Sequence, residues 1–183
     1  MRRVAITGIS GSGKTTTAQR LAARLDVPAI ETDALNHGPE WQEVSADELR
    51  ARVEKALTEA PDGWVVDATS SSKLGDYFYE RADTLVWLDL PLGTCLWRIW
   101  RRTWGRIIRR EQLWHGNRET MRNAFFVRES LFRGAVRSYR SNPHMLPARA
   151  ARHAHLRFVR LRSPHEVERF LETVSVDGER TLR

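Results

Sequence analysis

Short apolar runs alternate along this chain with longer stretches in which apolar residues recur at helical spacing. The run Val4-Ala5-Ile6 precedes residues 18–25, where Ala18, Leu21, Ala22 and Leu25 follow the i, i+3, i+4, i+7 pattern of an amphipathic helix. The alternation then repeats. It predicts further strands at residues 28–33, 64–67, 85–89 and 155–161, and further helices at 46–57, 92–99, roughly 117–139 and 164–174.

Strands that alternate with helices predict an α/β fold, here a five-stranded parallel sheet with helices on both faces. The 183 residues are expected to form one domain. Residues 104–116 are Arg-rich and only weakly periodic, so we expect them to form a lid insert. Residues 70–81 are expected to form a loop with a short helix, and residues 142–147 a loop.

The first strand runs into Gly-Ile-Ser-Gly-Ser-Gly-Lys-Thr, residues 8–15, which fits the phosphate-loop pattern with no mismatch. Glycines allow backbone N–H groups to surround phosphates, and the helix that follows turns its positive end toward the same anion. In this pattern Lys14 contacts the terminal phosphates and Thr15 binds Mg²⁺. The expected nucleotide-binding residues here are Gly8, Ile9, Ser10, Gly11, Ser12, Gly13, Lys14, Thr15 and Thr16.

Three predicted strands end in aspartate, namely Asp33, Asp67 and Asp89. Parallel sheets bind ligands beyond the carboxyl ends of their strands, where the phosphate loop also lies. We expect Asp67 to hold Mg²⁺ and Asp33 to serve as a metal contact or as a general base toward an acceptor hydroxyl. Asp89 precedes Pro91 and is more simply explained as a strand terminus.

Charge is unevenly distributed. Residues 92–162 contain 17 arginines and three acidic residues, hence +14, whereas the whole chain has a formal net charge of +7. Such a segment favours a polyanion, either a phosphorylated small molecule or nucleic acid. Trp97, Trp100 and Trp104 alternate with these arginines, a pattern that fits stacking on nucleic acid bases or packing against the core; we favour packing.

The phosphate loop, Asp33, the strand ending in Asp67 and the segment Leu-Trp-Arg-Ile-Trp-Arg-Arg at residues 96–102 together resemble the P-loop nucleotide kinase superfamily. Within it, residues 64–67, 82–91 and 114–119 are similar to adenylate-kinase-like proteins often labelled DNA topology modulation proteins. The resemblance implies that Arg98 stacks on the adenine of ATP and that Arg102 approaches the phosphates. It also implies that lid arginines close over the site, from among Arg106, Arg109 and Arg110.

The chain departs from adenylate kinases at residues 67–71, which read Asp-Ala-Thr-Ser-Ser in place of Asp-Gly-Phe-Pro-Arg. The arginine that holds AMP is therefore missing at that position, and adenylate kinase activity is not expected. His37 and Trp41 follow Asp33, where related kinases bind the acceptor, and they fit either acceptor contacts or a loop histidine beside an aromatic packing residue. Arg118 and Arg122 fit either phosphate ligands or a solvated basic face.

These observations predict an ATP-dependent kinase that uses Mg²⁺ and transfers the γ-phosphoryl group to a small acceptor, such as a nucleotide or nucleoside. The alternatives are an ATP-responsive nucleic-acid-associated protein and a polynucleotide end kinase.

We expect no membrane partner, a monomer or homodimer, and a cytoplasmic location, since no signal peptide is visible. The single cysteine, Cys95, excludes an internal disulfide and is expected to be buried. The expected catalytic residues are Lys14, Asp33, Arg102, Arg106 and Arg110, and the expected metal ligands are Thr15, Asp67 and Asp33.

Overall fold

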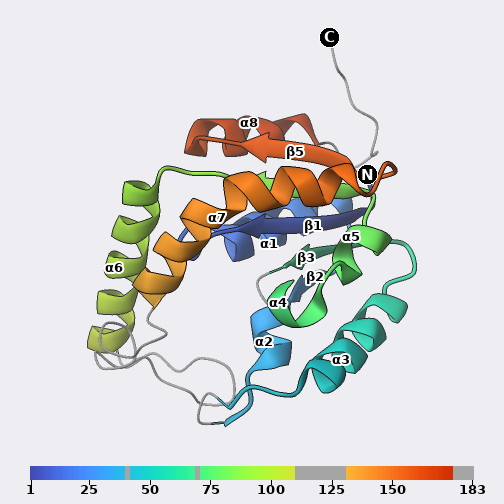
Figure 1. Ribbon diagram of the computed structural model, residues 1–183, viewed down its shortest axis with the longest axis horizontal. Coiled ribbons are helices and arrows are strands. Elements are labelled where there is room, and N and C mark those ends of the chain that lie inside the picture. Colours follow the sequence, from blue (N-terminus) through green and yellow to red (C-terminus); the bar gives the residue numbers. More distant parts are fainter. Residues whose placement is uncertain (40–41, 69–70, 110–130, 175–183) are drawn as a thin grey trace.

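A five-stranded parallel sheet forms the centre of the molecule, in the order β2-β3-β1-β4-β5 (Figure 1). The computed structural model describes residues 1–39, 42–68, 71–109 and 131–174. Its strands are β1 (Arg3–Gly8), β2 (Ala29–Glu31), β3 (Trp64–Asp67), β4 (Thr84–Leu88) and β5 (Arg157–Leu161). The α/β fold and the parallel sheet predicted from the sequence are confirmed.

Helices lie on both faces of the sheet, and α6 stands beyond the carboxyl ends of the strands in Figure 1. In the described part of the chain, none of them combines the length and the apolar character that a bilayer crossing requires. The helices are α1 (Lys14–Leu25), α2 (Thr32–Asn36), α3 (Ala46–Thr58), α4 (Ser71–Leu74), α5 (Tyr77–Arg81), α6 (Leu92–Arg109), α7 (Leu131–Ala151) and α8 (Pro164–Thr173).

Two helices begin where the sequence provides a capping residue. The Ser45 side chain accepts a hydrogen bond of 3.1 Å from the backbone N–H of Glu48 at the start of α3, and Ser163 does the same for Glu166 at the start of α8. Each bond satisfies a donor that the helix itself leaves unpaired. These caps explain why both helices begin at the positions that the sequence predicted.

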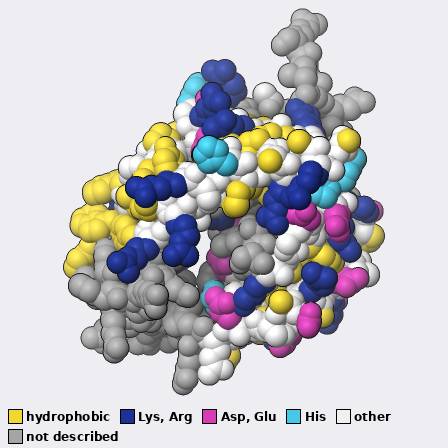
Figure 2. Space-filling model, viewed as in Figure 1, with side chains coloured by type: hydrophobic (Ala, Val, Ile, Leu, Met, Phe, Trp, Pro, Cys, Tyr) yellow, Lys and Arg dark blue, Asp and Glu magenta, His cyan; other side chains and the backbone are white. Residues whose placement is uncertain are grey.

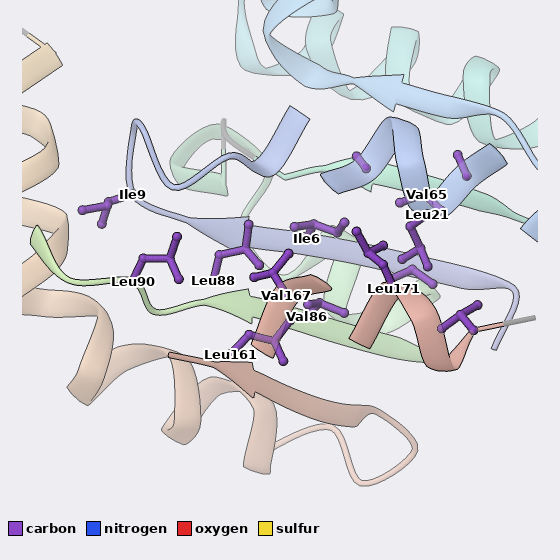
Figure 3. Packing of buried hydrophobic residues seen from close by; sticks show 14 of the residues in the cluster. Ile6, Ile9, Leu21, Val65, Val86, Leu88, Leu90, Leu161, Val167 and Leu171 are labelled. Carbon is purple, nitrogen blue, oxygen red and sulfur yellow. The ribbon is translucent and has the colours of Figure 1, made fainter. Parts of the chain in front are cut away.

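The two faces of the sheet pack into two separate cores because side chains alternate along each strand. On β1, Val4 and Ile6 face a core shared with α1 and α8, whereas Ala5 faces the core shared with α3, α4 and α5. Figure 3 shows the first core, in which Ile6 and Val86 from neighbouring strands meet Leu171 of α8. This packing fixes the carboxyl end of β1, from which the phosphate loop leaves.

Four expectations from the sequence differ from the structure. Residues 142–147 are helical, because α7 continues through Pro143 and Pro147. A proline inside a helix costs about 3 kcal/mol, and we attribute its tolerance here to the burial of Leu146 and Ala150, which continue the inward stripe of α7. Asp33 lies in the first turn of α2, because β2 already ends at Glu31.

The other two differences concern α6. It continues through Arg109, so residues 104–109 of the expected lid are helical, while residues 110–116 lie outside the described residues. Trp97, Trp100 and Trp104 of this helix are exposed, so the expectation that they pack against the core was wrong. Of the helix expected at 117–139, the part from residue 131 belongs to α7, and the remainder lies outside the described residues.

Candidate active site

The loop between β1 and α1 has the backbone of an anion cradle. Gly13 caps α1 with φ 94°, a left-handed conformation that favours glycine. The turn is closed by a 3.1 Å hydrogen bond from the Ser12 N–H to the Ile9 carbonyl, and α1 begins with a 2.9 Å bond from the Thr17 N–H to the Gly13 carbonyl. The remaining N–H groups at the start of α1, with the helix dipole behind them, form a site for phosphate.

Helix α6 packs tightly against this loop. A Cβ placed on Gly11 would lie 2.3 Å from the Cys95 carbonyl oxygen and 2.8 Å from Ile99 Cγ1, so only glycine fits there. Gly11 also has φ 79°, which disfavours any other residue. Cys95 is buried as expected, and burial raises the pKa of its thiol, which makes it a poor nucleophile.

Two polar groups of the loop are buried, and their hydrogen bonding within the described part of the chain is incomplete. The Lys14 side chain is only 7% exposed, and its ammonium donates to the neutral Ile9 carbonyl at 3.2 Å. The Ser12 hydroxyl is buried and makes no hydrogen bond within the described part of the chain. Burying such groups is unfavourable unless they are paired. An anion in the loop would pair both, so these residues fit a bound phosphate chain.

Thr15 and Asp67 lie together at the ends of α1 and β3. The Thr15 hydroxyl donates a 2.6 Å hydrogen bond to Asp67 Oδ2, and the Asp67 backbone carbonyl accepts a 2.6 Å bond from the Thr32 hydroxyl. A hydroxyl and a carboxylate suit Mg²⁺, which takes few protein ligands and is completed by water and phosphate oxygens. Among the described residues, no cluster of three or more His, Cys, Asp or Glu side chains could hold a metal alone.

Asp33 faces the same site from the first turn of α2. Burial raises the pKa of its carboxyl group above the ordinary value, and the nearby charge of Asp67 adds to this rise. The positive charges of Lys14 and Arg102 and that of His37 oppose it without cancelling it. Asp33 is thus a half-buried carboxyl group within electrostatic reach of the phosphate loop, of the Thr15–Asp67 pair and of α6.

The arginines of α6 differ in their contacts with this site. Arg98 donates a 3.3 Å hydrogen bond to the Ser12 carbonyl and lies beside Gly13, so it borders the phosphate loop. Arg102, one turn further, acts on Asp33 through its charge. Arg106 follows one turn later on the same helix. Arg110, Arg118 and Arg122 lie outside the described residues, as does the Arg109 side chain.

Asp89 has a structural role. Its Oδ2 accepts hydrogen bonds of 2.9 Å and 2.6 Å from Arg160, whose guanidinium group lies 4.3 Å from the centroid of the Trp87 ring. The ion pair therefore ties the end of β4 to β5. This agrees with the interpretation of Asp89 as a strand terminus.

Lys73 of α4 is a residue that the sequence did not single out. Its ammonium donates 2.9 Å hydrogen bonds to the Asn36 side chain and to the Val44 carbonyl, and it pairs with Glu43 at 2.6 Å. The hydrogen bond from Lys73 lowers the pKa of Glu43. Lys73 thus joins both ends of the loop after α2, the loop that carries His37. Trp41, expected on the same loop, lies outside the described residues.

The comparison with known families agrees with this geometry. A family model described as an AAA domain matches residues 4–120, which is well over half of the chain and includes the phosphate loop, Asp33, Asp67 and the arginines of α6. No curated protein matches the sequence.

Proposed function

This chain belongs to the AAA domain family, whose members are built on a P-loop nucleotide-binding domain, and we propose that it is an ATP-dependent phosphotransferase acting on a hydroxyl group of a small acceptor. The resemblance to adenylate-kinase-like proteins is part of this proposal. So is the cytoplasmic location.

The observation that carries the proposal is the environment of Asp33. A carboxyl group with a raised pKa, held near Lys14 and Arg102, is suited to accept a proton beside a bound phosphate chain. A phosphorylated acceptor would need no base and would be repelled by the ionised carboxylate. The absence of the AMP-binding arginine motif at residues 67–71 agrees with an acceptor that carries a hydroxyl group, such as a nucleoside or a small alcohol.

Each residue of the site would have a separate role in binding ATP and Mg²⁺. The loop N–H groups, Lys14 and Ser12 would bind the β- and γ-phosphates of ATP. Thr15 and Asp67 would hold Mg²⁺, which supplies positive charge to the phosphates when bound. Arg98 would border the nucleotide, and Arg102 would neutralise charge that develops on the transferred group.

The transfer needs little beyond alignment and charge neutralisation. The acceptor oxygen would form the new P–O bond, and the bond between the γ-phosphorus and the bridging oxygen would break, which releases ADP. Asp33 would take the proton from the acceptor hydroxyl. The α6 arginines that border the loop would help to exclude water, which otherwise competes as the acceptor.

The test is a transfer assay with γ-labelled ATP and Mg²⁺ against nucleosides, nucleoside monophosphates and small alcohols. We expect label on a hydroxyl-bearing acceptor. Asp33→Asn should reduce the rate by about 10²–10⁴-fold, the usual contribution of a general base, while MgATP binding persists. Asp89→Asn is the matched control, since it removes a carboxylate that pairs with Arg160, and it should transfer label at the wild-type rate.

Two results would contradict the proposal. One is transfer confined to nucleoside monophosphates with Asp33→Asn fully active, which would indicate a phosphate acceptor. The other is MgATP binding without transfer to any acceptor, which would indicate a nucleotide-binding protein that is not a kinase.

A further inference from the structure

Three tryptophans on α6 form an exposed aromatic stripe. Trp97 is 58% exposed, Trp100 42% and Trp104 36%. The rings of Trp97 and Trp100 stack at 5.1 Å between centroids with an angle of 20°, and Trp104 meets Trp100 edge-on at 6.2 Å. The stripe runs about 10 Å along the helix, since each residue advances the axis by about 1.5 Å. Exposure of three large stacked rings on one helix indicates a binding surface.

The stripe lies on the opposite side of α6 from the nucleotide site. At about 100° per residue, Trp100 is about 160° around the helix from both Arg98 and Arg102. Arg98 contacts the Ser12 carbonyl of the phosphate loop. The aromatic stripe therefore belongs to a different surface from the candidate active site.

A groove between α6 and α7 adjoins the stripe. It is an open groove with a volume of about 730 Å³, and its apolar lining comes from Leu96, Phe132 and Val136. Leu96 is one turn before Trp100 and so connects the groove to the stripe. The arginines of α7 that line the groove are Arg133, Arg137 and Arg140.

The charge around this surface has one sign. Helices α6 and α7 contain no acidic residue, and the exposed Arg101 of α6 lies near the stripe while Arg133, Arg137 and Arg140 of α7 line the groove, so the surface complements a polyanion. In Figure 2, hydrophobic side chains gather over α6, and Lys and Arg side chains lie beside them, in the region of α7. The complementary charge excludes a cationic partner.

The exposed rings beside the arginines narrow the class of partner further. Arginine prevails throughout the chain, which has only three lysines, so it is the combination of arginines with exposed rings that points to the partner. A lipid surface attracts either residue, whereas arginine also stacks on bases and grips phosphate oxygens with two donors. Exposed aromatic rings beside arginines are the combination by which proteins hold unpaired bases and track the phosphate backbone. In a duplex those base faces are already stacked, so a single strand suits the stripe.

We propose that the Trp97–Trp100–Trp104 stripe and the arginine-lined groove beside it form a docking surface for single-stranded nucleic acid, separate from the nucleotide site. Bases stack on the tryptophans, and Arg101 of α6 together with the groove arginines of α7 contacts the phosphates. The surface binds without marked sequence preference, because stacking accepts any base.

The test measures the binding of a fluorescently labelled 20-residue oligothymidylate to the full chain by anisotropy over a range of salt concentrations. The charge-neutral double variant Trp97→Ala/Trp100→Ala should weaken binding by about tenfold or more, since each stacked base contributes at that level, without changing the salt dependence. Arg137→Gln/Arg140→Gln should weaken binding and flatten the plot of log affinity against log salt by about 0.7 for each phosphate that the variant no longer neutralises.

Matched controls separate stacking from general attraction. Trp97→Phe/Trp100→Phe should retain most of the affinity, because phenylalanine also offers an aromatic face, and Met145→Ala removes an exposed apolar side chain of α7 without effect. MgATP binding should be unchanged in the Trp variants, which shows that they are folded. In the wild-type protein, ultraviolet crosslinking to a 5-bromodeoxyuridine oligonucleotide should label Trp97, Trp100 or Trp104, and this measurement requires no variant.

Several results would overturn the proposal. Unchanged oligonucleotide affinity in the Trp-to-Ala variant, or a duplex bound as tightly as the single strand, would show that binding is non-specific charge attraction without base stacking. Trp-dependent binding to vesicles with anionic phospholipids, in the absence of oligonucleotide binding, would identify a membrane surface. A dimer in sedimentation that Trp97→Ala dissociates would identify contact with a second copy.

Discussion

The two sides of helix α6 differ in packing and exposure. The inner side is fitted to the phosphate loop so closely that the Gly11 position has no room for a methyl group beside the Cys95 carbonyl. The outer side carries three exposed tryptophans, and the described structure gives them stacking contacts with one another. The comparison shows that one helix can define a rigid site on one side while presenting an adaptable surface on the other.

The largest expected effect comes from the inner side. Gly11→Ala should weaken MgATP binding by about 100-fold or more, because the new methyl group displaces the loop and its phosphate-binding N–H groups. The left-handed backbone adds a cost of about 1–2 kcal/mol to the folded state. Titration calorimetry and thermal unfolding measure the two effects.

Gly105→Ala is the matched control on the same helix. A Cβ there meets nothing within 4 Å, so alanine should raise the free energy of unfolding by about 0.5–1 kcal/mol through its better helix propensity. Nucleotide affinity should be unchanged. If Gly11→Ala and Gly105→Ala had the same MgATP affinity, the tight contact between α6 and the loop would not matter for nucleotide binding.

An intermediate effect is expected from a pair of arginines on the two sides. Arg98→Ala should weaken MgATP binding by about tenfold, the usual cost of one charge-assisted contact. Arg101→Ala, three residues on and exposed, should leave MgATP binding unchanged and weaken oligonucleotide binding. The opposite pattern would show that the two sides have been assigned wrongly.

The smallest expected effect is the influence of Arg102 on the pKa of Asp33. Arg102 lowers the pKa of Asp33, so Arg102→Gln should raise that pKa further. If Asp33 is the base, the acid limb of the pH–rate profile moves to higher pH, because the ionised form is the active one. Arg101→Gln should leave the profile in place, and an Arg102→Gln profile identical to wild type would argue against Asp33 as the base.

Asp33 and Arg102 should also affect how the free energy of unfolding depends on pH. The pKa of Asp33 is higher in the folded protein than its ordinary value of 3.8, so ionisation of this group costs folding free energy. That cost is absent below pH 3.8 and fully present above the raised pKa, which means that the contribution of Asp33 to stability falls as pH rises through this window. Arg102→Gln should extend the window upward, and in an Asp33→Asn background this difference should disappear.

The sequence predicted the parts of the site that local spacing encodes. The phosphate loop, Lys14 and Thr15 follow from eight consecutive residues, and Asp67 follows from its place at the end of an apolar strand. Asp33 was predicted as a site residue at the end of a strand, but it lies on a short helix. Helix α2 begins at Thr32, directly after β2 ends at Glu31. A change from strand to helix this abrupt leaves no periodic signal.

Other features depend on contacts that spacing does not encode. The tryptophans of α6 and the buried Cys95 and Ile99 both recur at helical spacing, and only the position of the phosphate loop decides which set faces inward. The Asp89–Arg160 pair joins residues 71 positions apart, and Lys73 contacts Asn36 across 37. The continuation of α7 through Pro143 and Pro147 rests on its buried stripe, which overrides local preference.

The most direct test of the account is the binding of ATP with and without Mg²⁺, measured by titration calorimetry. We predict Mg²⁺-dependent binding to the wild-type chain and a loss of about 100-fold or more in Lys14→Ala, since Lys14 is the buried cation of the loop. Lys55→Ala, which removes an exposed lysine of α3, should bind as the wild type does. Wild-type protein with no affinity for ATP, or Lys14→Ala with undiminished affinity, would contradict the account.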